Sequence, residues 1–192
     1  MALPLDVKLA LQQQVPRVMR KDLERITREK FKKIKKEMID EFLGNPITQE
    51  IMAGPDASNI SGTLGGVSNL FAFIGFNQGE QPIAPILALL ENATLEYTRP
   101  TKSRGMGIIF TVSLPAAQDI FAVTPLPWAT GRSWAEGIER GLSGLGYLLR
   151  KKRGRSGAAV QSRVKIRGGR FSNSPYISSF ILKYKKRFED LQ

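Results

Sequence analysis

The densest group of side chains that could bind a charged ligand is a basic cluster late in the chain. Residues 148–170, named here the late basic segment, contain nine Lys or Arg residues and no acidic residue. These nine are Arg150, Lys151, Lys152, Arg153, Arg155, Arg163, Lys165, Arg167 and Arg170. Such a cluster can neutralise several nucleic-acid phosphates without reading the bases. The other interpretation is a solvated loop or one that faces an acidic partner, and both stay open.

The side chains that most enzymes use as nucleophiles, general bases or metal ligands are missing or scattered. The chain has no Cys and no His, which excludes zinc sites built on those ligands, disulfides, and Cys or His nucleophile chemistry. Asp and Glu form no tight cluster in the sequence that would hold Mg²⁺. Asp119 is the one carboxylate in a long apolar stretch, and we expect it to cap a short helix. We therefore expect no enzymatic activity, no metal and no cofactor.

The glycines that precede the late basic segment resemble those of a phosphate-binding loop, but the other residues of such a loop are missing from the sequence. No Gly-Lys-Ser/Thr sequence follows them, as a nucleotide site requires. Gly137 and Gly141 are four residues apart, so they share one face of a helix predicted over 133–149, next to Trp134. Each glycine weakens a helix by about 1 kcal/mol, which favours a compensating close contact. We expect Gly137, Gly141 and Trp134 to be close-packing positions, within the chain or against a neighbouring copy.

Charge is distributed in blocks along the 192 residues. The 29 cations exceed the 17 acids and give a net charge of +12, which favours a polyanionic or acidic partner. Residues 44–98 hold five acids and no cation, whereas the late basic segment holds nine cations. Either the two blocks complement each other between copies of the protein, or they lie on different faces of a monomer. The hydrophobic share of 42% is enough for one folded domain.

A long charged helix is predicted over residues 17–43, after an N-terminal arm at residues 1–16. Its apolar residues recur at helical spacing, while Lys and Arg fill the other faces. The apolar stripe is narrow for so long a helix, so part of it should face a partner. The positions expected at that interface are Leu23, Ile26, Ile34 and Met38.

The rest of the chain predicts an α+β domain over residues 17–192, with about four strands in a small, mostly antiparallel sheet and a closing amphipathic helix. Helices are expected over 46–52, 81–91, 133–149 with Ser133 as N-cap, and 174–191 with Ser174 as N-cap. Strands are expected over 68–76, 93–98, 105–114 and 158–166, and a basic loop over 148–157. Prolines interrupt the apolar stretch 105–131, so it cannot span a membrane as a helix, and we expect no membrane partner.

The segments TGRSWAEGIERGLSGLGYLL, SGAAVQSRVKI and SPYISSFILKYKKRF, with the basic loop between the first two, resemble the neck and tail-completion proteins of tailed bacteriophages. The resemblance is one of arrangement and covers most of the chain loosely. It implies a structural virion protein that forms an oligomeric ring between head and tail, around the channel for genomic DNA. The implied partners are copies of itself, other neck, portal and tail proteins, and non-specifically bound DNA. The other hypothesis is a free, non-specific nucleic-acid-binding protein.

Overall fold

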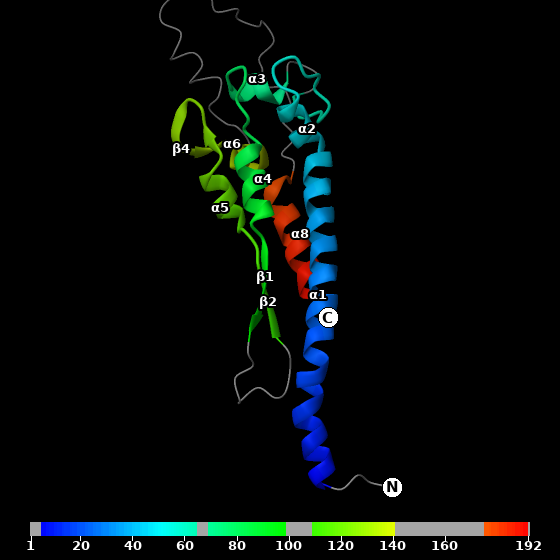
Figure 1. Ribbon diagram of the computed structural model, residues 1–192. Helices are drawn as coiled ribbons and strands as arrows, with labels where there is room; N and C mark the ends of the chain where they lie inside the picture. Colours follow the sequence, from blue (N-terminus) through cyan, green and yellow to red (C-terminus); the bar gives the residue numbers. More distant parts are fainter. Residues whose placement is uncertain (1–4, 65–68, 99–108, 141–174, 192) are drawn as a thin grey trace, which may run out of the picture.

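The computed structural model describes residues 5–64, 69–98, 109–140 and 175–191, and these form an α+β fold dominated by one long helix (Figure 1). The late basic segment and the strand expected over 158–166 lie outside these ranges. The expected fold class is confirmed, with a long N-terminal helix, small antiparallel sheets and a C-terminal helix.

Helix α1 (Leu5–Gly44) is longer than the sequence pattern predicted. It begins at Leu5 rather than at residue 17, so most of the expected arm continues the same helix. Forty residues at 1.5 Å each give a length of about 60 Å. In Figure 1 the N-terminal part of α1 projects past the rest of the described protein. At the other end, the Asn45 side chain accepts a hydrogen bond from the Ile47 N–H at 2.9 Å and starts the expected helix α2 (Pro46–Met52).

Helix α8 (Ile177–Glu189) runs antiparallel to the second half of α1. The rings of Phe31 and Phe188 lie 5.3 Å apart, and those of Phe42 and Phe180 lie 5.8 Å apart. Helix α8 also packs against α5 (Ala117–Ala122) and α6 (Trp134–Arg140), and α4 (Ala84–Glu91) packs against α1. One face of α8 is buried, as its amphipathic sequence predicted, and it consists of Ile177, Phe180, Ile181, Tyr184 and Phe188. The C-terminal segment is therefore fixed to the N-terminal helix.

The strands form two separate hairpins rather than the single small sheet that we expected. Strand β1 (Thr94–Thr98) pairs with β2 (Ile109–Ser113), which confirms the two strands predicted in this region. Strand β3 (Pro125–Leu126) pairs with β4 (Ala129–Ser133), which the sequence analysis did not predict. Each pair is antiparallel.

The prediction of a strand over residues 68–76 is wrong, because this segment contains helix α3 (Leu70–Ile74). Asn69 caps the helix by accepting a hydrogen bond from the Ala72 N–H at 2.8 Å. Gly75 ends it with a φ of 89°, a left-handed conformation that favours glycine. A side chain at Gly75 would also meet the Trp128 ring at 3.3 Å. Local caps at both ends therefore outweigh the apparent strand-like alternation.

Two predicted helix caps are confirmed. Asp119 accepts a hydrogen bond from the Ala116 N–H at 2.7 Å at the start of α5. Ser133 accepts one from the Glu136 N–H at 3.1 Å at the start of α6. Asp119 was expected to cap a short helix, but the bounds of α5 were not predicted from the sequence.

The core gathers apolar side chains from the second half of α1, α2 to α6, α8 and strand β1. Trp134 lies near its centre, 1% exposed, with its ring edge-on to Phe76 at a centroid distance of 5.8 Å. The Trp128 indole N–H donates to the Ile74 carbonyl at 2.7 Å and fixes the β3–β4 hairpin to α3. Within the described ranges, no helix combines the length and apolar character needed to cross a membrane.

Candidate interaction surface on the first helix

The sequence-predicted site residues fall into three groups in the structure. All nine cations of the late basic segment, together with Gly141, lie outside the described residues. Trp134 is buried as expected of a close-packing position, and Gly137 is half-buried within α6. The four residues expected at an interface all lie on α1 and differ from one another in exposure.

Two of these four interface residues remain accessible to a partner. Leu23 is 37% exposed and Ile26 is 42% exposed. Ile34 is partly buried against the core. Met38 is completely buried, so its placement at an interface is wrong: it packs within the protein's own core. The amphipathic pattern could not separate these cases, because core-facing and partner-facing residues follow the same helical spacing.

The first described stretch of α1 side chains, residues 20–29, balances its own charge. Arg28 pairs with Glu24 at 2.8 Å, and Arg25 pairs with Glu29 at 3.3 Å. The Arg20 guanidinium stacks over the Tyr97 ring, 4.1 Å from its centroid. The two ion pairs, Arg28–Glu24 and Arg25–Glu29, are worth only a few tenths of a kcal/mol each. They nevertheless leave this stretch nearly neutral around the exposed Leu23 and Ile26.

The next stretch, residues 30–36, contains five lysines and no acid. Lys35 is held in place, because its ammonium donates to the Glu91 carbonyl and to the Ala93 carbonyl, the latter at 2.9 Å. Phe31 is buried and Ile34 partly buried, so both turn toward the core. The other four lysines are exposed and form no ion pair within the described part of the chain. We name Lys30, Lys32, Lys33 and Lys36 the lysine quartet.

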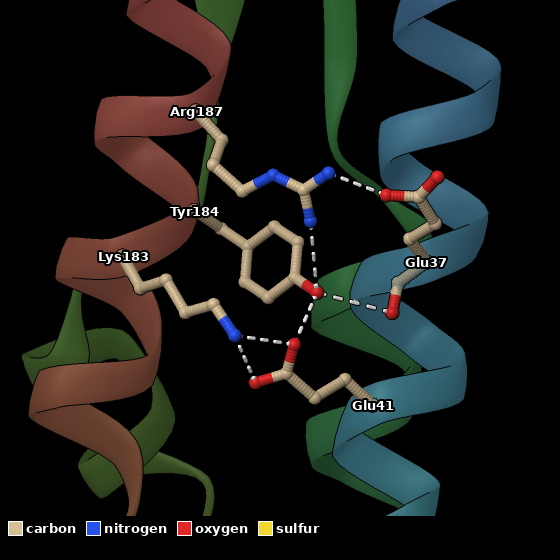
Figure 2. Close-up of polar contacts among 5 residues, drawn as sticks. All are labelled: Glu37, Glu41, Lys183, Tyr184 and Arg187. Carbon is tan, nitrogen blue, oxygen red and sulfur yellow. Dashed lines mark hydrogen bonds and ion pairs between the residues drawn. The ribbon is translucent and has the colours of Figure 1, made fainter.

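The last stretch of α1 carries acids that hold α8. Figure 2 shows this α1–α8 clamp, which consists of Glu37, Glu41, Lys183, Tyr184 and Arg187. Arg187 pairs with Glu37, and the Lys183 ammonium lies 2.7 Å from both Glu41 oxygens. The Tyr184 hydroxyl lies 2.7 Å from Glu41 Oε2 and 3.1 Å from the Glu37 carbonyl oxygen. The clamp therefore uses Glu37, which stands four residues from Lys33 and could otherwise have paired with it.

Contacts within the α1–α8 clamp shift the pKa values of Glu41 and Tyr184. Hydrogen bonds from Lys183 and from Tyr184 lower the pKa of Glu41 below its ordinary value of 4.5, against a smaller opposing effect of burial. Burial, reinforced by the hydrogen bond to Glu41, raises the pKa of Tyr184 to about 12. Glu41 is thus ionised and Tyr184 neutral at neutral pH.

The acidic block at residues 44–98 does not form one exposed surface. Glu50 is 0% exposed, and its carboxylate accepts hydrogen bonds from Asn59 Nδ2 at 2.9 Å, the Ser61 N–H at 2.9 Å and the Leu70 N–H at 2.7 Å. The remaining four acids of the block are exposed, namely Asp56, Glu80, Glu91 and Glu96. Only these four are available to a basic partner surface.

Three features escaped the sequence analysis: the buried Glu50, the capping of α8 by Glu139 of α6, and the lysine quartet. Glu139 accepts hydrogen bonds from the Ile177 and Ser178 N–H groups and from the Ser178 hydroxyl, the last at 2.6 Å. The expected cap Ser174 lies outside the described residues. The sequence alone could not reveal the quartet, because Glu29 and Glu37 each stand four residues from Lys33. Only the structure shows that Glu29 pairs with Arg25 and that Glu37 pairs with Arg187.

The described residues contain no group of three or more carboxylates that could hold a metal ion. A shallow surface depression lies along α1 and is lined by Lys21, Glu24, Arg25, Arg28, Glu29 and Lys32. No protein-family model matches the chain, and neither a curated protein nor a solved structure is significantly similar to it.

Proposed function

We propose that this protein is a structural component of a tailed-phage virion, a neck or tail-completion protein that forms an oligomeric ring joining head to tail. The observation that carries the proposal is the projecting N-terminal part of α1. None of residues 20–30 is buried, although Leu23 and Ile26 are apolar. Most helical stability in proteins comes from packing of an apolar face, so this part of α1 requires a surface from another molecule.

A second copy of the chain is the occupant that the charges favour. The charge-balanced stretch 20–29 surrounds Leu23 and Ile26 without net repulsion. The four exposed acids of residues 44–98 and the nine cations of the late basic segment supply opposite charges on one chain, which suits a head-to-tail contact between identical copies. Head-to-tail contacts that close produce a ring. The sequence resemblance supplies the position of that ring, between portal and tail.

The proposal is tested by sedimentation velocity on the full chain. The wild type should form a closed oligomer at high protein concentration or with portal and tail proteins present. Leu23→Gln with Ile26→Gln should shift it to the monomer, because two apolar contacts per interface are lost. The matched control is Met52→Gln with Ile60→Gln, two other exposed apolar residues, which should leave assembly unchanged. A wild type that remains a monomer under all these conditions contradicts the proposal.

The second candidate function is a free, non-specific nucleic-acid-binding protein. The net charge of +12 favours it. It requires that the monomer bind nucleic acid with an affinity that falls steeply with salt, and that neutralising Arg150–Arg155 abolish most of this binding. A virion ring component instead requires failed head–tail joining after the same change.

A further inference from the structure

The charges of α1 are arranged in three consecutive stretches with different partners. Arg25 and Arg28 pair with acids of the stretch 20–29, and Glu37 and Glu41 pair with α8. The lysine quartet lies between these stretches, and none of its four ammonium groups forms an ion pair within the described structure, although the exposed Asp40 stands four residues from Lys36. The quartet is therefore a site where positive charge is concentrated on an ordered helix and left for a partner.

The spacing within the quartet makes this concentration unfavourable for the isolated helix. Lys30 and Lys33, and Lys33 and Lys36, are three residues apart, while Lys32 and Lys36 are four apart. Side chains at these spacings are neighbours on the helix surface, and like charges there are destabilising. An acid at any of these positions would remove the repulsion, as the preceding stretch illustrates with Glu24 and Glu29. A bound polyanion removes it equally well.

We infer that the lysine quartet binds the phosphate backbone of a nucleic acid, without sequence preference and separately from the late basic segment. The quartet face offers no apolar anchor, because Phe31 and Ile34 turn toward the core. Protein interfaces rely on aromatic and apolar anchors and are depleted in lysine. Phosphates are instead bound by lysine ammonium groups acting as point charges.

The geometry of α1 suits such a ligand. The axial rise from Lys30 to Lys36 is about 9 Å, which matches about three steps of roughly 3.4 Å along one strand of a duplex. The helix is held at this point from two sides, by the Lys35 contact with the Glu91 and Ala93 carbonyls and by the α1–α8 clamp. The quartet is thus positioned before the ligand arrives, which reduces the entropic cost of binding.

The inference applies equally to a ring and to a free protein, because all four lysines belong to one chain. It therefore does not depend on the proposed function. The proposed ring requires Leu23 and Ile26, which are absent from the quartet, so either proposal can fail while the other holds.

The test measures binding of the full chain to a short mixed-sequence DNA duplex by fluorescence anisotropy over a range of salt concentrations. The variant replaces all four quartet lysines by glutamine, which keeps helix propensity. The matched control removes four exposed cations elsewhere, Lys21→Gln, Arg132→Gln, Arg140→Gln and Lys185→Gln, and so loses the same charge.

The quartet variant should bind at least about tenfold more weakly and lose about two units or more of the slope of log K against log salt, since each phosphate contact contributes about 0.9. The control should lose less than about one unit. Replacing the quartet by four arginines should preserve binding, and circular dichroism should show the same helix content for every variant.

Equal losses in the quartet variant and the control overturn the inference, because they show a response to net charge alone. Unchanged DNA binding together with weaker self-association in sedimentation also overturns it, and assigns the quartet to an acidic surface of a second copy. Loss of binding in the arginine variant, despite intact helix content, contradicts it as well.

Discussion

At the scale of single residues, buried polar side chains determine how the segment after α2 is folded. Glu50 is completely buried and accepts three hydrogen bonds, two of them from backbone N–H groups. Asn69 adds hydrogen bonds to the carbonyls of Pro55 and Ala57, the second at 2.9 Å. These bonds fix the described residues between α2 and α3, and both carboxylate oxygens of Glu50 act as acceptors.

We predict that Glu50→Gln lowers the free energy of unfolding by about 2 kcal/mol, because the amide NH₂ would face an N–H donor and leave it unpaired. Urea denaturation measures the change. The control is Glu96→Gln on the exposed face of β1, for which we expect a change within about 0.5 kcal/mol. Equal effects of the two substitutions would show that Glu50 is not a buried acceptor.

The lowered pKa of Glu41 predicts that the free energy of unfolding decreases at acid pH. Its pKa is lowered in the folded state, chiefly by the hydrogen bond from Lys183. A lowered folded pKa means that the stabilisation is present above the unfolded value of 4.5 and is lost as the pH falls through the lower folded value. The wild type should therefore lose stability over this range.

The measurement for this prediction is urea denaturation of the wild type and of Glu41→Gln at a series of pH values from neutral to acid. The difference in unfolding free energy between the two proteins should be largest above the ordinary carboxyl range and shrink as the pH falls below it. A difference that is independent of pH would mean that the ionised Glu41 contributes nothing through Lys183 and Tyr184.

At the scale of elements, contacts between segments distant in sequence complete the helix ends. Glu139 of α6 accepts hydrogen bonds from the first N–H groups of α8, where the local sequence provides no side-chain cap. A carboxylate at a helix N-terminus also interacts favourably with the helix dipole. Helix α8 is thus fixed at its start by α6 and along its length by α1.

We predict that Glu139→Ala destabilises the protein by about 1 to 2 kcal/mol, the usual cost of losing a cap. Glu136→Ala, on the same helix, removes only the ion pair with the exposed Arg140, so we expect about 0.5 kcal/mol or less. Chemical denaturation of both variants makes the comparison. Similar losses in the two variants would contradict the capping role of Glu139.

The predictable elements are those with strong local signals. Ser133 three residues before Glu136 indicated the start of α6, and the β-branched residues around Leu95 and Val112 indicated the first hairpin. The segment 68–76 was misread because its phenylalanines alternate like a strand over a few residues. The flanking signals, Asn69 as N-cap and Gly75 as C-terminal glycine, pointed to the helix that forms.

The candidate surface was harder to predict than the fold. The sequence showed that α1 is charged and predicted Leu23 and Ile26 at an interface; both residues are exposed, and their role at an interface stays a prediction. It could not show that Met38 is buried or that Glu37 and Glu41 are used by α8, because these facts depend on a helix almost 150 residues later in the chain. Only the tertiary contacts separate the lysine quartet from the paired cations around it.

At the scale of the whole molecule, one end of α1 belongs to the core and the other projects from it (Figure 1). The core supplies its own stability through α8 and the helices around Trp134. We therefore predict that Leu23→Gln with Ile26→Gln leaves the thermal midpoint of the monomer, measured by circular dichroism at low protein concentration, nearly unchanged. A marked fall in this midpoint would mean that the two residues stabilise the monomer rather than an assembly.

The central claim is that the protein works as a stoichiometric part of a virion. The most direct test is quantitative mass spectrometry of particles purified from cells that express the chain from its native genome. The account predicts that the chain is present in the particles at a fixed ratio to the portal protein. Abundant chain in the lysate but none in the purified particles would contradict it.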